Sequence, residues 1–196
     1  ELLGDGDYVL PLPAAPDPDP PWHAAGSVRG SLAPELCDRV YAYARQRGVT
    51  PFAVLLAAAK LLLSAYANQR DVRVGVPVAN REAPQTHGLI GCFINTLVVR
   101  SDVDLARSFD AHVGHVQARV LEAQEHAALP FERAVEALVR DRDVRRNPLF
   151  QVLVVMQTAR IASERWPGLD VHEIPAPAAA AQFDLSLEFH DDGARI

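Results

Sequence analysis

The chain has 196 residues, enough for one domain or one lobe of a larger domain. Its formal net charge of -6 argues against nucleic acid as a partner, because binding to a nucleic acid needs clustered Lys and Arg on an otherwise basic surface, and the one such cluster, at 140–146, is interrupted by two Asp residues. Hydrophobic residues make up 49% and supply ample material for a core. Cys37 and Cys92 lack metal or disulfide spacing, which predicts free thiols in a reducing, cytoplasmic compartment.

The start of the chain is expected to be a connector. Residues 11–22 read PLPAAPDPDPPW, and proline fixes φ and removes a backbone donor, so this stretch favours an extended link. We therefore assign residues 1–26 to a Pro-rich connector that leads into the compact part. A short strand is predicted at residues 27–32.

Two helices are predicted next. Residues 34–47 have apolar positions at helical spacing, and a glycine follows them. Thr50 and Pro51 favour a helix start, with threonine as the N-cap and proline at the first helical position. The helix that they open, 51–69, is apolar on nearly all sides. Lys60 at its centre favours a buried core helix over a membrane span.

Strand and helix patterns alternate along the rest of the chain. The predicted strands are 71–78, 89–100, 149–156, 169–174 and 183–189, from alternating or β-branched runs. The predicted helices are 106–126 and 131–140, with loops at 80–88 and 141–147. The run 149–156 is apolar on both faces and should be a central strand. This order predicts an α/β fold with a mixed β-sheet and flanking helices.

A pair of histidines could indicate a metal site. His112 and His115 lie three residues apart in the predicted helix 106–126, a spacing that can hold a metal. His112 falls at the border of the apolar stripe that runs from Phe109 to Val120, and His115 falls outside it. No carboxylate that points inward accompanies them. We favour two surface histidines and expect no metal.

Local motifs for catalysis are missing from the sequence. It contains no GxSxG, GxGxxG, Walker loop or HExxH, and no local arrangement suggests an activated nucleophile. The residues alone therefore indicate an α/β lobe without a self-contained active site.

Three stretches, in this order, resemble the later core motifs of condensation domains from nonribosomal peptide synthetases. They are IGCFINTLVVR at 90–100, HAALPFE at 126–132 and RDVRRNPLF at 142–150. VRVGVPVANR at 72–81, FDLSLEF at 183–189 and the apolar helix agree with the same pattern. The resemblance covers roughly residues 27–189. It depends on the agreement of all these motifs together, because any one of them alone is weak evidence for the family.

The resemblance implies a chloramphenicol-acetyltransferase-like lobe. Such domains are V-shaped pairs of lobes, and the first lobe carries an HHxxxDG loop with the catalytic histidine. No two histidines are adjacent in this chain, so it resembles the second lobe, at 27–196, without its final strand and helix. A lobe of this kind should be inactive by itself and should contribute no catalytic residue.

The resemblance also implies the partners. They are the first lobe and the donor and acceptor peptidyl carrier domains, and an adenylation domain is left open as a further partner. Phosphopantetheine would be carried by the carrier domains, with no cofactor bound directly to this chain. No nucleic acid or membrane partner is expected.

Five residues are candidates for the substrate tunnel or the lobe junction. Side chains alternate along 90–98, which would place Gly91, Phe93 and Asn95 on one face, and Pro77 and Asn80 lie near them in the pattern. Glycine admits the close approach of a slender ligand, and an amide can donate and accept hydrogen bonds. Alternatively, Asn95 satisfies loose backbone groups of the loop 80–88, because buried amides must be paired.

Two arginines are candidates for contact with a carrier domain or with phosphopantetheine phosphate. Arg146 matches the family pattern, whereas Arg145 stands where the family usually has serine. A guanidinium there can bind a phosphate, or it can pair with Asp141 or Asp143 of the same loop.

The resemblance leaves other functions open. Epimerisation domains share the fold but usually have a Trp in the stretch that matches 90–96, and they lack the FINT pattern found here at 93–96. Heterocyclisation domains differ in a loop upstream of this chain. A non-catalytic module of the same fold that recruits a partner enzyme is a further candidate. An acyltransferase that uses free coenzyme A is disfavoured, because no DFGWG-like stretch occurs.

Overall fold

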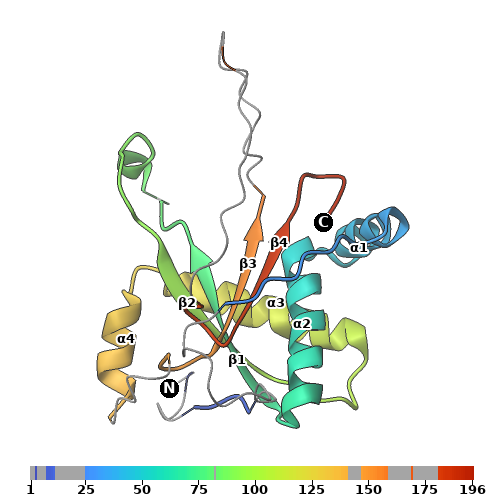
Figure 1. Ribbon diagram of the computed structural model, residues 1–196, viewed down its shortest axis with the longest axis horizontal. Helices are drawn as coiled ribbons and strands as arrows, with labels where there is room; N and C mark the ends of the chain where they lie inside the picture. The colour runs from blue at the N-terminus through green and yellow to red at the C-terminus, as the bar shows by residue number, and fades with distance from the viewer. Residues whose placement is uncertain are drawn as a thin grey trace.

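The computed structural model describes residues 3, 8–11, 25–81, 83–140, 147–158, 169 and 181–196. Within them lies a four-stranded sheet in the order β2-β1-β3-β4 (Figure 1). The strands are β1 Asp71–Val78, β2 Asn95–Asp102, β3 Val152–Gln157 and β4 Leu185–His190. β2 runs antiparallel to β1, whereas β1, β3 and β4 are parallel. The predicted α/β fold with a mixed sheet is confirmed, and β3 is a central strand as expected.

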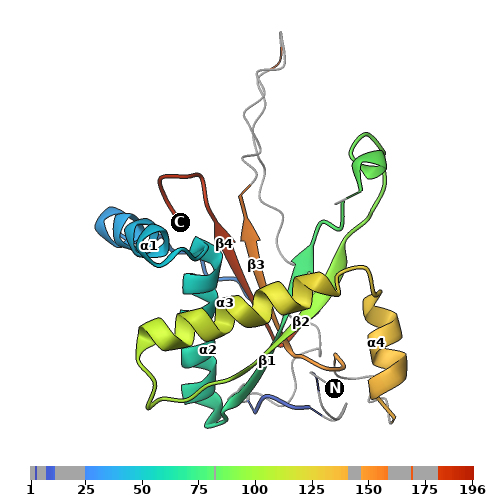
Figure 2. The same ribbon diagram turned by 180° about the vertical axis from the view of Figure 1, so that it is seen from behind.

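Helices flank this sheet. They are α1 Pro34–Arg47, α2 Pro51–Ala67, the 3₁₀ turn η1 Pro84–Thr86, α3 Phe109–Glu125 and α4 Phe131–Leu138. α2 and α3 pack against each other and against the strands, and Figure 2 shows α3 crossing the face that is turned toward the viewer. α4 lies beside β2, at the edge of the sheet.

The predicted helix starts and stops follow capping chemistry. Thr50 precedes α2, and its Oγ1 accepts a hydrogen bond of 3.1 Å from the Ala53 N–H. Gly48 ends α1 with φ of 64°, a left-handed conformation that favours glycine. None of the described helices is by itself long and apolar enough to span a membrane, and α1 and α2, which pass only as a pair, are bent by 109°.

α2 forms the centre of the main core. Its buried Leu56 and Leu63 belong to the same cluster as Val74 of β1 and Val154 of β3. Burial of each such side chain stabilises the fold by roughly 1.5–3 kcal/mol, which makes α2 a principal element of the core.

Lys60 is a fully buried amine inside this core. Its Nζ donates to the carbonyl oxygens of Val72 and Val99, each at 2.8 Å. Burial lowers the pKa of Lys60 to about 7. A neutral amine has two N–H groups, which matches the two carbonyls that it meets.

An aromatic cluster packs on the face of the sheet opposite to the main core. Phe150 packs where Gly75 of β1 leaves room, since a Cβ on Gly75 would lie 2.3 Å from the Phe150 ring. The Phe150 ring centroid is 5.6 Å from that of Phe131 and 5.4 Å from that of Phe183. This contact joins three segments that are distant in the sequence.

Residues 8–11 lie beside β1. The Tyr8 hydroxyl accepts from the Arg73 N–H at 3.0 Å and donates to the Asp71 carbonyl oxygen at 3.1 Å. Burial raises the pKa of Tyr8 to about 12. Gln151 accepts from the Leu10 N–H at 2.9 Å, so its buried side chain ties this segment to the start of β3.

Several predicted boundaries were wrong. The strand predicted at 27–32 is not present. Val28 is fully exposed, and Leu32 makes one backbone hydrogen bond, to Ile196, at 2.9 Å. β3 begins at Val152 and not at residue 149, because Leu149 has a left-handed φ of 67°. The strand predicted at 169–174 lies outside the described residues, except for residue 169.

The strand predicted at 89–100 was wrong in its first half. β2 begins at Asn95, whose partner in the register, Val78, is the last residue of β1. Within the part of the chain that the structure describes, no strand pairs with residues 89–94. They belong to the loop between β1 and β2, which projects beyond the end of the sheet (Figure 1).

Candidate functional site

Asn95 joins the start of β2 to the link between α3 and α4. Its Nδ2 donates to the carbonyl oxygens of Ala127 and Leu129, each at 2.8 Å. Its Oδ1 accepts from the Phe131 N–H at 3.1 Å and from the Thr96 N–H at 2.9 Å. The amide therefore satisfies backbone groups, as one interpretation of the sequence predicted. Three of the four groups belong to residues 127–131, the fourth is the Thr96 N–H, and none belongs to the loop 80–88.

Gly91 and Phe93 are loop residues, not residues of a strand. A Cβ on Gly91 would lie 3.3 Å from the Phe93 ring, so the glycine allows the two to lie close together. Asn80 adopts a left-handed φ of 51° at the start of the same loop, and Pro77 pairs with Thr96 at the end of the sheet. The structure thus brings the predicted candidates to one end of the β1–β2 hairpin, but not onto one strand face.

Sequence reasoning missed the residue that organises this loop, Arg81. Its guanidinium donates to the carbonyl oxygens of Thr86, Leu89 and Gly91 and lies over the Phe93 ring, 4.3 Å from its centroid. The signal was present, because Arg81 closes the VRVGVPVANR stretch. Its targets are backbone carbonyls, however, and these leave no pattern in the sequence.

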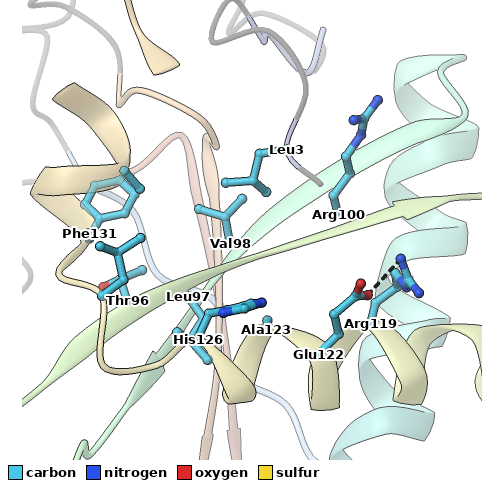
Figure 3. A pocket seen from close by; sticks show the side chains of 12 residues that line it. Leu3, Thr96, Leu97, Val98, Arg100, Arg119, Glu122, Ala123, His126 and Phe131 are labelled. Atoms are coloured by element: carbon cyan, nitrogen blue, oxygen red, sulfur yellow. Dashed lines mark ion pairs between the residues drawn. The ribbon is translucent and has the colours of Figure 1, made fainter. Parts of the chain in front are cut away.

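A cavity of about 130 Å³ lies along the outer edge of β2 (Figure 3). The close-up shows Val98 and Leu3 on one side of the strand, with Leu97 and His126 on the other. Its lining comes from β2, α3, α4 and the N-terminal segment: Leu3, Thr96, Leu97, Val98, Arg100, Arg119, Glu122, Ala123, His126, Leu129, Phe131 and Ala134. No sequence motif predicted it, because the lining joins distant segments.

A second, polar hollow of about 280 Å³ adjoins the first through Arg100 and Arg119, which line both. Asp71 and Asp102 supply carboxylates to it. Arg100 pairs with Asp71 at 2.9 Å, and Arg119 pairs with Glu122 at 2.8 Å. These charges are balanced in pairs, which suits a structural role.

Two further ionisable groups at this hollow have shifted pKa values. A hydrogen bond from Arg70 lowers the pKa of Asp102. Burial lowers the pKa of His115, which lines the same hollow. Both shifts favour an ionised aspartate and a neutral histidine near neutral pH.

The prediction of two surface histidines was wrong for His112. It is 1% exposed, and its Nε2 donates to the Ala57 carbonyl oxygen at 3.2 Å, because α2 packs over this part of α3. Burial lowers its pKa, so it is neutral in the core. His115 is half-buried. Within the described ranges, no group of three or more His, Cys, Asp or Glu side chains could hold a metal ion.

The predicted carrier contacts at Arg145 and Arg146 lie outside the described residues. They stay predictions, as do the alternative ion pairs with Asp141 and Asp143.

Residues 4–196 match the family model described as "Condensation domain". Among curated proteins, the chain is 38% identical over 157 residues to tyrocidine synthase 3 of Brevibacillus parabrevis, a match that spans 80% of the chain and 2% of that protein. It is 33% identical over 162 residues to gramicidin S synthase 2 of Brevibacillus brevis, a match that spans 83% of the chain and 4% of that protein. The chain therefore spans only a small part of each of these curated relatives.

Solved structures share the fold. The X-domain in its complex with OxyB from teicoplanin biosynthesis has a TM-score of 0.81 at 26% identity, over 98% of this chain and 43% of that one. The condensation domain of the Monacolin K polyketide synthase MokA has a TM-score of 0.72 at 24% identity, over 83% of this chain and 38% of that one. The chain thus spans less than half of each of these two structures.

Proposed function

The chain belongs to the condensation-domain family of nonribosomal peptide synthetases, and from this premise we propose that it is the second lobe of such a domain. Together with a first lobe, it would line the tunnel in which two carrier-bound groups react. The amine of the acceptor attacks the thioester carbonyl of the donor. A C–N bond forms, the C–S bond breaks, and the donor's phosphopantetheine thiol leaves with a proton.

The observation that supports this role best is the convergence of the motif segments in one corner of the fold. Asn95 of the FINT stretch holds the LPFE segment through the Leu129 carbonyl and the Phe131 N–H. Phe150 of the NPLF stretch packs between Phe131 and Phe183. Segments that are far apart in the sequence thus form one frame, and the β1–β2 loop extends from its end.

A lobe without an acid or base of its own can still accelerate this reaction. An α-amine has an ordinary pKa of about 7.7–8.0, so much of it is already nucleophilic near neutral pH. Correct positioning of two reactants lowers a barrier by roughly 7–11 kcal/mol in the best intramolecular cases. We assign the catalytic histidine to the first lobe, since the seven histidines of this chain include no adjacent pair.

The partners follow from the same proposal. Donor and acceptor carrier domains would present their groups on phosphopantetheine from opposite ends of the tunnel, and Arg145 and Arg146 stay candidates for contact with one of them. Gly91, Phe93, Asn95, Pro77 and Asn80 stay candidates for the tunnel wall and the lobe junction.

The test uses the polypeptide in which this chain is joined to its natural upstream sequence. Donor and acceptor carrier domains are loaded with aminoacyl groups, and the mass of the acceptor carrier is followed. We expect the acceptor to gain the donor's acyl group, and we expect loss of that transfer when the second histidine of an upstream HHxxxDG is replaced by alanine. Failure of the unmodified protein to transfer would refute the proposal.

A recruitment module is the second candidate function. It is favoured by the similarity to the X-domain solved in a complex with OxyB, which extends over 98% of this chain. The upstream loop separates the two functions. An intact HHxxxDG with acyl transfer supports catalysis, whereas a degraded loop without transfer supports recruitment of a partner enzyme.

A further inference from the structure

Arg81 connects the end of β1 to an exposed loop through several contacts at once. Its Nη1 donates to the carbonyl oxygens of Thr86 at 2.6 Å and Leu89 at 2.9 Å, and its Nη2 donates to that of Gly91 at 2.7 Å. One side chain therefore fixes three backbone positions across ten residues of sequence.

The face of the same guanidinium covers an aromatic ring. Its Cζ lies 4.3 Å from the centroid of the Phe93 ring, within the range of a cation–π contact. His87 completes the arrangement, because its Nε2 lies 2.8 Å from the Arg81 carbonyl oxygen. The positions of Gly91 and Phe93 thus both depend on Arg81.

These contacts shape a surface and do not fill the core. Arg81 and Phe93 are half-buried, and neither belongs to the main core cluster. The loop that they hold displays apolar side chains, with Ile90 fully exposed and Leu89 and Ile94 largely exposed. A loop held by charge-assisted hydrogen bonds presents such side chains in one arrangement, which lowers the entropy lost on binding.

We propose that Arg81 is a positioning residue for the condensation reaction: it fixes the Gly91–Phe93 part of the tunnel wall against which a carrier-bound acyl group packs. The inference depends on the proposed function and deepens it, because it assigns part of the selection by acyl size to this loop. Arg81 touches no reacting atom in this account and acts through Gly91 and Phe93.

Lysine cannot replace this side chain. A planar guanidinium donates in several directions of one plane and stacks on a ring at the same time, whereas an ammonium is a compact point charge. Arg81→Lys should therefore behave like Arg81→Ala and not like the parent protein. A role that needs only a positive charge would give the opposite result.

The experiment uses the intact polypeptide with loaded carrier domains. The kcat/KM for two acyl donors, one small and one bulky at the side chain, is measured for the parent, Arg81→Ala and Arg81→Lys. Each charge-assisted hydrogen bond is worth about tenfold in a rate that depends on it, so we expect a fall of at least about tenfold. We also expect the ratio between the two donors to change by about fivefold or more, with little change in the unfolding midpoint.

Chemical rescue and a matched control separate positioning from stability. Guanidinium ion, added below denaturing concentrations, should restore part of the activity of Arg81→Ala, whereas it would only harm a variant that is merely destabilised. Arg133→Ala removes an arginine whose described ion pair, with Glu136, lies on the exposed side of α4, and it should behave like the parent.

The outcomes distinguish this inference from the proposed function. If the parent protein transfers acyl groups and Arg81→Ala does so with an unchanged donor ratio, the role of Arg81 is refuted and the proposed function stands. An activity loss that matches the loss of folded protein, without rescue, also overturns it. If the parent protein itself transfers nothing, the proposed function fails first.

Discussion

At the scale of single residues, side-chain amides and amines in this lobe satisfy backbone groups that the secondary structure leaves open. Asn95 is the clearest case, because its one amide serves four backbone groups. The FINT stretch thus has a structural reason for its polar residue. The sequence indicated that Asn95 needed partners, but three of the four come from a link that the chain reaches more than thirty residues later, so they could not be identified from local pattern.

Replacing Asn95 with leucine should destabilise the lobe. The change removes an NH2 group that donates two hydrogen bonds and an oxygen that accepts two. It leaves the part-buried Ala127 carbonyl and Phe131 N–H without these partners, so we expect the free energy of unfolding to fall by about 2–4 kcal/mol. Chemical denaturation measures this. Gln85→Leu, at an exposed position, serves as the control and should change little. An unchanged midpoint for Asn95→Leu, together with lost acyl transfer, would instead assign Asn95 to the tunnel.

Lys60 should make the stability of the lobe depend on pH. Its pKa is about 7 in the folded state against an ordinary value of 10.5, so the unfolded chain binds a proton in this window and the folded chain does not. Stability due to this group therefore rises with pH between about 7 and 10.5, by at most about 1.4 kcal/mol per pH unit. Below about pH 7 the contribution of Lys60 to the free energy of unfolding is lower and no longer changes with pH.

The variant Lys60→Met tests this linkage. Its free energy of unfolding, measured by denaturant titration from neutral to alkaline pH, should rise less steeply than that of the parent. Parallel curves for the two proteins would show that Lys60 keeps its ordinary pKa in the fold, or that its protonation costs nothing there.

At the scale of elements, the sequence was informative wherever local chemistry decides the structure. α1 was predicted at its observed bounds, and so was β1, because a helix stop and a β-branched alternating run are local signals. The start of β2 was not predictable in this way. Apolar alternation continues through residues 89–94, but β1 ends at Val78, so these residues find no partner strand among the described ones. Strand length here depends on the partner strand.

Gly75 is the element-scale position that we expect to be most sensitive. A methyl group there would lie 2.3 Å from the Phe150 ring, which is held between two other rings. Gly75→Ala should therefore destabilise the lobe by about 1–3 kcal/mol, because the ring must shift. Thermal or chemical unfolding measures the change.

Two further variants show whether the ring is the cause. Phe150→Leu should lower the free energy of unfolding less in the Gly75→Ala background than in the parent protein, because it also removes the clash with the added methyl group. Gly114→Ala is the matched control in α3, where an added Cβ meets nothing within 4 Å, and it should stabilise by about 0.5–1 kcal/mol. Simple additivity of the pair at Gly75 and Phe150 would exclude the steric account.

At the scale of the whole molecule, the fold class could be predicted, but the functional surface only in part. Alternating strand and helix patterns predicted a mixed sheet with flanking helices, and the motif order indicated the family. The cavity along β2 depends on contacts between segments that are distant in the sequence. Such contacts are set by tertiary packing, which no single motif records. The contacts of Arg81 are closer in sequence, but they go to backbone carbonyls of an irregular loop, which leave no residue pattern.

The central claim is that this lobe supplies one wall of a reaction site completed by a second lobe. The most direct measurement compares acyl transfer between loaded carrier domains by this chain alone, by the proposed first lobe alone, and by the two joined in one polypeptide. The account predicts product from the joined protein and none from either part by itself. Transfer at the full rate by this chain alone would contradict it.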